Sequence, residues 1–319
     1  MNRSIFFGFY NGLGDLISDL VWIRRFVDEG YDLTISVSSW LESLTRFLVP
    51  ESDIIMAGLK EDISAHRYDY DLIFLTPNYL HPFSGNPRSI PAYISKYLQV
   101  KKRAPESAVI LHPSMYELLG YMFGFSDNYL HRHFSMMSYG LLQKYAPLFS
   151  KTPAILAPPP EPSHEAYPEI SELFIFPYSG NEAKNYPLEA YLQIAKQLQS
   201  TCPGLNIRFF VTPKEYEQTR KEITGFEVVT TSLENLCTLF GPRVLILCAD
   251  SGPGHLGSYF KSHALILFGM TDSKKYAPKG EGKILTLQSP TPRVAEIPLQ
   301  TVFEKITSSF TLPKKEERT

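Results

Sequence analysis

Short apolar runs and longer amphipathic stretches alternate along almost the whole chain. Apolar runs of four to eight residues are typical of buried strands, and apolar residues three and four apart are typical of helices. The first half alternates in this way through seven expected elements: strand Ser4–Phe9, helix Leu16–Val27, strand Leu33–Val37, helix Trp40–Leu48, strand Asp71–Leu75, and helices Pro113–Phe123 and Phe134–Tyr145.

The alternation stops at residues 153–168, which contain six prolines and read as a linker. It then restarts with strands Glu172–Phe176, Asn206–Val211, Glu227–Val229, Arg243–Cys248 and Ala264–Phe268, and helices Pro187–Leu198, Pro213–Ile223, Leu233–Phe240, Gly254–Tyr259 and Leu299–Phe310. The pattern predicts two open parallel α/β domains, residues 1–155 and 156–319, facing each other across a cleft. Ligands of such sheets bind beyond the carboxyl ends of the strands.

Composition narrows the function classes without changing this fold. The 319 residues are 44% hydrophobic and 20% charged, which is ordinary for a globular protein, and the net charge of -2 does not indicate a nucleic-acid partner. No apolar run approaches the roughly 20 residues of a membrane span, and the start lacks the features of a signal peptide, so we expect a cytoplasmic protein. The three cysteines, Cys202, Cys237 and Cys248, are expected to be free, apolar and reduced.

The first candidate loop is N-G-L-G-D, Asn11–Asp15, between the first strand and the first helix. Its glycines, Gly14 among them, let the backbone turn sharply and approach a ligand. Asp15 near the helix start would face a ligand, or it would simply cap the helix. A dinucleotide loop is disfavoured, because the second strand ends in S-V-S-S without an acid to hold a ribose.

The second candidate loop is F-P-Y-S-G-N-E-A-K-N-Y-P, Phe176–Pro187, after the first strand of the second domain. Ser179 and Gly180 would expose backbone N–H groups, and Lys184 supplies a positive charge just before a helix. This combination suits a phosphate oxygen. The alternative is a solvated lysine in a turn.

The third candidate loop, A-D-S-G-P-G-H-L, joins a buried strand to a short helix. The proline presets the first helical turn, whose free N–H groups and positive dipole end suit an anion such as a diphosphate. A lone histidine is more often structural, but here it would lie beside the lysine loop. The residues expected to reach the ligand are Asp250, Ser251, Gly252, Gly254 and His255.

Three stretches together resemble one family. D-S-G-P-G-H-L followed by L-F-G-M-T-D, Leu267–Asp272, is similar to the donor-site signature of glycosyltransferase family 9, the ADP-heptose:lipopolysaccharide heptosyltransferases. N-G-L-G-D-L-I resembles the acidic loop of the family's first domain, and S-G-N-E-A-K-N-Y-P resembles its turn, lysine, aromatic and proline pattern. The resemblance runs in order through most of the chain and is strongest from Ser179 to Pro278.

The resemblance implies a GT-B architecture and an inverting transfer of a sugar, by analogy heptose from ADP-heptose, to a lipopolysaccharide inner-core acceptor, with neither metal nor cofactor. The acceptor would bring the enzyme into peripheral contact with the cytoplasmic face of the inner membrane. Asp15 would be the general base, and Lys184, Ser251, Gly252 and His255 would hold the donor diphosphate. Asp250 would contact the donor sugar or fix its loop, and Thr212 would lie near the nucleotide.

Some residues depart from the family pattern. Tyr186 stands where the family usually has tryptophan, and the first helix has Ser18-Asp19-Leu20-Val21 where many members have a proline. These departures bear on the identity of the donor sugar and the acceptor more than on the fold. The alternative function is a non-catalytic nucleotide- or glycan-binding relative of the same fold, and an epimerase on this fold is a third.

Two metal-like patterns carry little weight. Asp69-Tyr70-Asp71 matches the D-x-D pattern of metal-dependent sugar transferases, but it precedes its strand and so faces the wrong edge of the sheet. His131-Arg132-His133 has no cysteine or carboxylate cluster near it in sequence, and it reads as a polar helix start.

Overall fold

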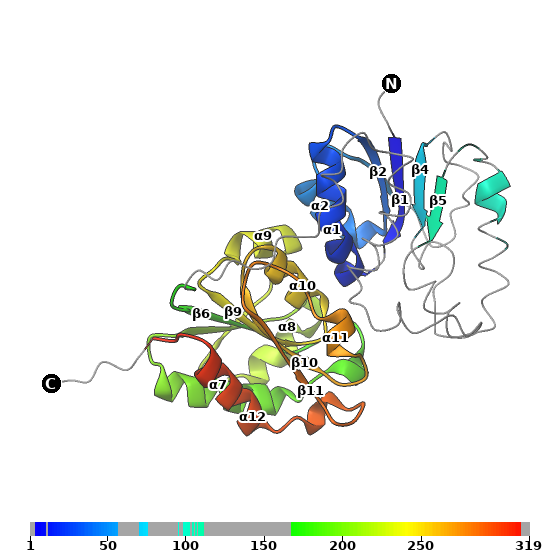
Figure 1. The fold of residues 1–319 in the computed structure, drawn as a ribbon. Helices are drawn as coiled ribbons and strands as arrows, with labels where there is room; N and C mark the ends of the chain where they lie inside the picture. The colour runs from blue at the N-terminus through cyan, green and yellow to red at the C-terminus, as the bar shows by residue number, and fades with distance from the viewer. Residues whose placement is uncertain are drawn as a thin grey trace. The chain divides into compact units, whose positions relative to one another are not determined.

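The chain forms two compact units, Met1–Pro159 and Pro160–Thr319, each built on a parallel sheet (Figure 1). A computed structural model describes residues 4–10, 12–56, 70–75, 95, 98–102, 104, 106, 108–111 and 167–313. The predicted fold class, two parallel α/β domains, is confirmed. The expected helices Pro113–Phe123 and Phe134–Tyr145, and most of the proline-rich segment, lie outside the described residues.

The N-terminal unit has a five-stranded parallel sheet in the order β3-β2-β1-β4-β5. Right-handed crossovers place α1 and α2 on one face of this sheet. The strand order reverses between β1 and β4, which is where open sheets of this kind bind ligands. Its described elements are β1 (Ser4–Tyr10), α1 (Leu13–Asp28), β2 (Asp32–Val37), α2 (Ser39–Leu48), β3 (Asp53–Met56), β4 (Leu72–Leu75) and β5 (Ala108–Leu111).

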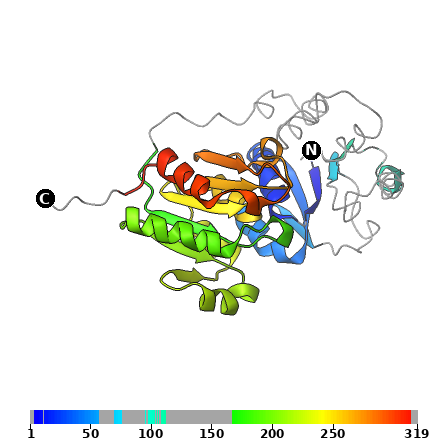
Figure 2. The same ribbon diagram turned by 90° about the horizontal axis from the view of Figure 1, so that it is seen from below.

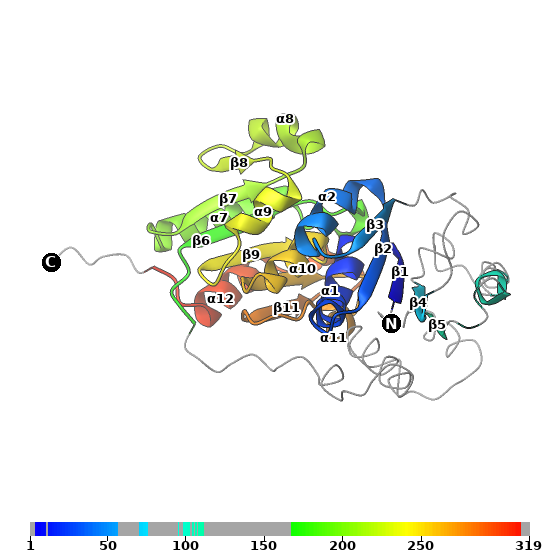
Figure 3. The ribbon, with the colours of Figure 1, turned by 90° about the horizontal axis from the view of Figure 1, so that it is seen from above.

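The C-terminal unit has a six-stranded parallel sheet in the order β11-β10-β9-β6-β7-β8, reversing between β6 and β9. Its strands are β6 (Glu172–Phe176), β7 (Asn206–Phe210), β8 (Glu227–Val229), β9 (Val244–Ala249), β10 (His263–Phe268) and β11 (Ile284–Gln288). Its helices are η4 (Glu182–Lys184), α7 (Leu188–Thr201), α8 (Pro213–Glu222), α9 (Leu233–Leu239), α10 (Gly252–Tyr259), α11 (Ser273–Tyr276), η5 (Val294–Glu296) and α12 (Leu299–Ser309). Helices α7 and α12 lie side by side on one face (Figure 2), and α9 and α10 lie on the other (Figure 3).

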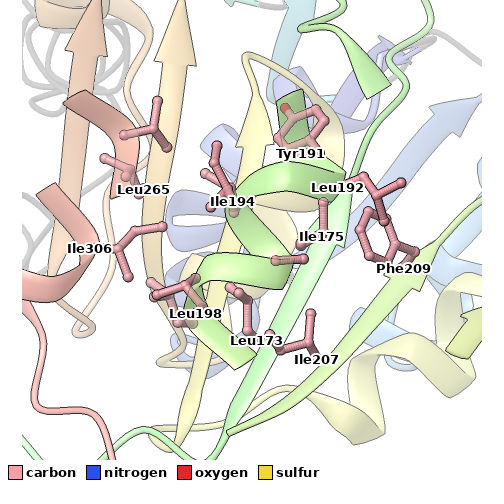
Figure 4. Packing of buried hydrophobic residues seen from close by; sticks show 14 of the residues in the cluster. Leu173, Ile175, Tyr191, Leu192, Ile194, Leu198, Ile207, Phe209, Leu265 and Ile306 are labelled. Carbon is pink, nitrogen blue, oxygen red and sulfur yellow. The ribbon is translucent and has the colours of Figure 1, made fainter. Parts of the chain in front are cut away.

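The main core lies between the sheet and the α7–α12 pair. Alternate residues of the central strands point to this face because successive strand side chains alternate in direction. Tyr191, Ile194 and Leu198 of α7 meet them, together with Ile306 of α12 (Figure 4). Burying a side chain of this size contributes about 1.5–3 kcal/mol, so this face holds the sheet in place.

The opposite face owes its close packing to glycine. A Cβ added to Gly257 of α10 would lie 1.9 Å from Cδ1 of Ile246, and one added to Gly254 would lie 2.9 Å from Cδ1 of Ile266. These glycines let α10 press directly against β9 and β10, which fixes the start of α10 at the end of β9. Gly254 therefore has a packing role that the sequence analysis did not foresee.

Several sequence predictions are confirmed, and some short elements were missed. Cys202, Cys237 and Cys248 are free and buried, and burial raises the pKa of both Cys237 and Cys248 to about 12. The missed elements are β3, β5, β11 and the four-residue helix α11. These elements have four or five residues, and a run that short carries too little periodicity to be recognised.

His263, the buried first residue of β10, joins two neighbouring segments at the amino end of the sheet. Its Nε2 donates to the Pro242 carbonyl at 2.9 Å, and its Nδ1 accepts from the Lys283 amide at 3.0 Å. The neutral ring with its proton on Nε2 satisfies both bonds, whereas a protonated Nδ1 would face another donor. Burial lowers the pKa of His263, the Pro242 carbonyl opposes this shift, and the Lys283 charge adds to it.

We expect folding stability to fall as the pH drops below 6.5, the ordinary pKa of histidine. The unfolded chain then binds a proton that the folded His263 resists, at a slope of at most about 1.4 kcal/mol per pH unit. His263→Gln should be less stable at neutral pH, and its stability should depend less steeply on pH. Urea denaturation at several pH values measures both. His255 is the same in both proteins, so parallel pH curves would contradict the assignment.

Candidate functional site

The loop after β6 is held by its own asparagines, so that Lys184 is presented at a fixed place. The Ser179 amide donates to Oδ1 of Asn185 at 2.8 Å, and the Ala183 amide donates to Oδ1 of Asn181 at 3.1 Å, which begins η4. Lys184 is the last residue of η4. These two asparagine side chains fix the backbone of the loop, and the Lys184 side chain extends from it across the carboxyl end of the sheet.

Asp250, directly after β9, joins three loops. Its Oδ2 accepts from Nζ of Lys184 at 2.7 Å and from Oγ1 of Thr271 at 2.6 Å. Its amide donates to the Leu267 carbonyl of β10 at 3.0 Å. The neighbouring strands β6, β9 and β10 therefore end in one polar cluster, at the point where the strand order reverses.

The start of α10 lies in the same cluster. Ser251 is the N-cap residue, but its hydroxyl donates to the Ala249 carbonyl at 2.9 Å, and no side-chain cap is seen there in the described structure. Helix starts without a side-chain cap present the positive end of the helix dipole and any N–H groups that are not bonded within the helix. Gly252 and Pro253 open the helix. Pro253 has no N–H and the Gly254 N–H donates to the Ser251 carbonyl at 3.2 Å, so the Gly252 N–H and the helix dipole are what this end offers an anion.

His255 lies in the first turn of α10, and the charges of both Asp250 and Lys184 affect its pKa. Withdrawal of its ring from water lowers its pKa, the Asp250 carboxylate opposes this effect, and the Lys184 ammonium adds to it. The ring is therefore neutral at neutral pH, with one N–H group to donate. The structure thus places Lys184, Asp250, Ser251, Gly252 and His255 close together. Their roles toward a ligand stay predictions.

One predicted site residue, Thr212, has another local explanation, and the space around another, Gly180, is open. Thr212 is the N-cap of α8, and its amide donates to Oε2 of Glu215 at 3.0 Å in a capping box, with its hydroxyl bound to the same carboxylate. Nothing lies within 4 Å of a Cβ added to Gly180, so its position does not require glycine for packing. In the described part of the chain, the side-chain hydrogen bonds of Thr212 go to Glu215 and not to the Asp250 cluster.

The candidate base Asp15 lies in the first turn of α1, with Gly14 before it. A Cβ added to Gly12 would lie 2.8 Å from Oδ2 of Asp15. The carboxylate therefore folds back over Gly12, toward the carboxyl end of β1. Glycine at position 12 leaves room for it.

A buried pair next to Asp15 was missed by the sequence reasoning. The Tyr10 hydroxyl donates to Oδ2 of Asp19 at 2.8 Å, and both side chains are buried. Burial raises the pKa of Tyr10 well above its ordinary value, Asp19 adds to this shift, and Asp15 contributes a smaller part. Asp19 lies four residues after Asp15, on the same helix face, and that spacing was the available signal.

The metal-like patterns gain no support among the described residues, which contain no group of three or more His, Cys, Asp or Glu side chains able to hold a metal. Asp71 precedes β4, as expected, and its Oδ2 accepts from the Ser4 amide at 2.7 Å. Asp69 and the His131-Arg132-His133 run lie outside the described residues. Within the described helices, none has the length and apolar character to span a membrane.

A family model matches the half of the chain that holds the Asp250 cluster. Residues 147–306 match glycosyltransferase family 9 (heptosyltransferase). The chain belongs to this family. The resemblance inferred from the three loop motifs is therefore confirmed, and the search of curated proteins found no match.

Solved structures of family members share this fold. Escherichia coli heptosyltransferase WaaC with ADP has a TM-score of 0.62 and 15% identity, over 96% of this chain and 99% of that one. Escherichia coli ADP-heptose lipopolysaccharide heptosyltransferase II has a TM-score of 0.63 and 16% identity, over 97% and 98%. A family 9 glycosyltransferase from Veillonella parvula has a TM-score of 0.62 and 16% identity, over 95% of each chain. These likenesses identify the GT-B fold of the heptosyltransferases.

The Gly12→Ala variant tests whether this glycine makes room for the Asp15 carboxylate. We expect the carboxylate to rotate away, and the melting temperature to change by less than about 3 °C, because the end of a flexible side chain yields at a cost under about 1 kcal/mol. A crystal structure and a thermal melt of the variant measure these two effects. Gly180→Ala, which adds a Cβ in open space, is the control. An unmoved Asp15 carboxylate would contradict the account.

Proposed function

We propose that this family 9 glycosyltransferase is an inverting enzyme that needs no metal and transfers a heptose from ADP-heptose to a lipopolysaccharide inner-core acceptor. The observation that carries the proposal is the cluster of Lys184, Asp250 and the start of α10 at the reversal point of the C-terminal sheet. Relatives of the same fold were solved with ADP and with ADP-2-deoxy-2-fluoro heptose, which supports a nucleotide-sugar donor.

The donor diphosphate would bind to the start of α10. Its negative oxygens would accept from the first-turn N–H groups and from the neutral His255 ring, and Lys184 would supply the compensating positive charge. The same groups would stabilise the charge that grows on the leaving diphosphate as its bond to the sugar breaks. This is how the site would lower the barrier without a metal ion.

The acceptor would be activated from the other unit. Asp15 would take the proton of the acceptor hydroxyl while its oxygen attacks the anomeric carbon and the bond to the diphosphate breaks on the opposite side. One displacement of this kind inverts the anomeric carbon. Asp15 and the donor cluster belong to different units, so the proposed reaction needs residues of both.

The Asp15→Asn variant separates catalysis from donor binding. We expect it to lower the transfer rate at least about 100-fold, the usual contribution of a general base, with the affinity for ADP unchanged. Transfer is measured as ADP release with ADP-heptose and a heptose-accepting inner core, and affinity by calorimetry. Asp28→Asn, an exposed acid at the end of the same helix, is the matched control and should keep full activity.

Two results would overturn parts of this proposal. Equal loss of transfer and of ADP binding in Asp15→Asn would contradict the general-base role. Binding of ADP by the unmodified protein, without transfer to any inner-core acceptor, would favour the non-catalytic relative that the sequence left open.

A further inference from the structure

In the structure, the Lys184 ammonium is already paired with a carboxylate. Its Nζ lies 2.7 Å from Oδ2 of Asp250, and the two side chains are 25% and 11% exposed. To bind a diphosphate, the ammonium has to give up some or all of this ion pair. The largely buried Asp250 carboxylate would then lose its countercharge, and a buried carboxylate without partners is costly.

Thr271 supplies the second partner of the same oxygen. Its Oγ1 donates to Oδ2 of Asp250 at 2.6 Å from the loop after β10. That loop is braced independently of Lys184: Nε2 of Gln288 donates to the Gly269 carbonyl at 2.9 Å, and the Asp272 side chain caps α11. Thr271 can therefore stay bonded to Asp250 when Lys184 leaves.

We propose that Thr271 is a positioning residue that holds the Asp250 carboxylate while Lys184 transfers from Asp250 to the donor diphosphate. This inference rests on the proposed function. Among the residues that the structure describes, two side chains donate to the Asp250 carboxylate, and in the bound state one of them, Thr271, would remain. Without the Thr271 hydroxyl, the Asp250 carboxylate would have one of these donors in the unliganded protein and neither of them when the diphosphate is bound. Losing the last hydrogen-bond partner costs more free energy than losing one of two.

The test compares the affinity of ADP for four proteins without added metal, by calorimetry. Thr271→Val should weaken ADP binding about tenfold, the low end of the effect of a hydrogen bond to a charged group. Thr271→Ser keeps the hydroxyl and should bind ADP within about twofold of the unmodified protein. Thr286→Val, on β11, removes a threonine hydroxyl from the neighbouring strand and should have no effect.

A double-mutant cycle separates positioning from a merely structural role. Asn at position 250 is neutral and does not need a countercharge, so in the Asp250→Asn background the Thr271→Val change should no longer weaken ADP binding. The same tenfold loss in both backgrounds would overturn the inference, as would unchanged binding by Thr271→Val alone. Failure of the unmodified protein to bind ADP is a different result, and it would overturn the proposed function as well.

Discussion

The candidate site of the C-terminal unit depends on the bonds that the Asp250 carboxylate accepts. One oxygen accepts from Lys184 and from Thr271, so the loops that follow β6, β9 and β10 are joined at a single atom. The glycines of α10 let the helix pack closely against β9 and β10, and this places its first turn beside the Asp250 carboxylate. Side-chain charge and backbone N–H groups then meet at one sheet end.

In this arrangement the charges of Lys184 and Asp250 compensate each other. Lys184 is paired with Asp250, and His255 is held in its uncharged form by its surroundings. Under the proposed function, a diphosphate would bind by taking over Lys184 from Asp250. Exchange of this kind favours ligands whose geometry matches the donors over anions in general.

Much of this could be predicted from the sequence, for physical reasons. Lys184 and Asp250 each follow a strongly apolar strand, and parallel strands end at one edge, so the polar loops after them were expected to be close. The Lys184–Asp250 pair itself was not predicted, because it depends on the rotamers of two side chains far apart in the chain. Gly254 was assigned to a ligand although the helix needs it for packing, and a sequence does not distinguish the two demands.

The N-terminal unit shows the same limit of sequence patterns. Asp15 was found from its position at a helix start, which is a local feature. The Tyr10–Asp19 hydrogen bond joins the end of β1 to the second turn of α1, so it depends on how the helix packs against the sheet. In the sequence, Asp19 stands out only as part of a stretch that departs from the family pattern. In the structure, its buried carboxylate accepts the hydrogen bond from Tyr10.

The most direct test of the account is a crystal structure of the protein with ADP bound. We predict that the diphosphate lies at the first turn of α10, within hydrogen-bonding distance of the backbone N–H groups there and of Lys184 Nζ. The Lys184–Asp250 distance should lengthen from 2.7 Å while the Thr271–Asp250 bond stays. A diphosphate bound elsewhere, with the Lys184–Asp250 pair intact, would contradict the account.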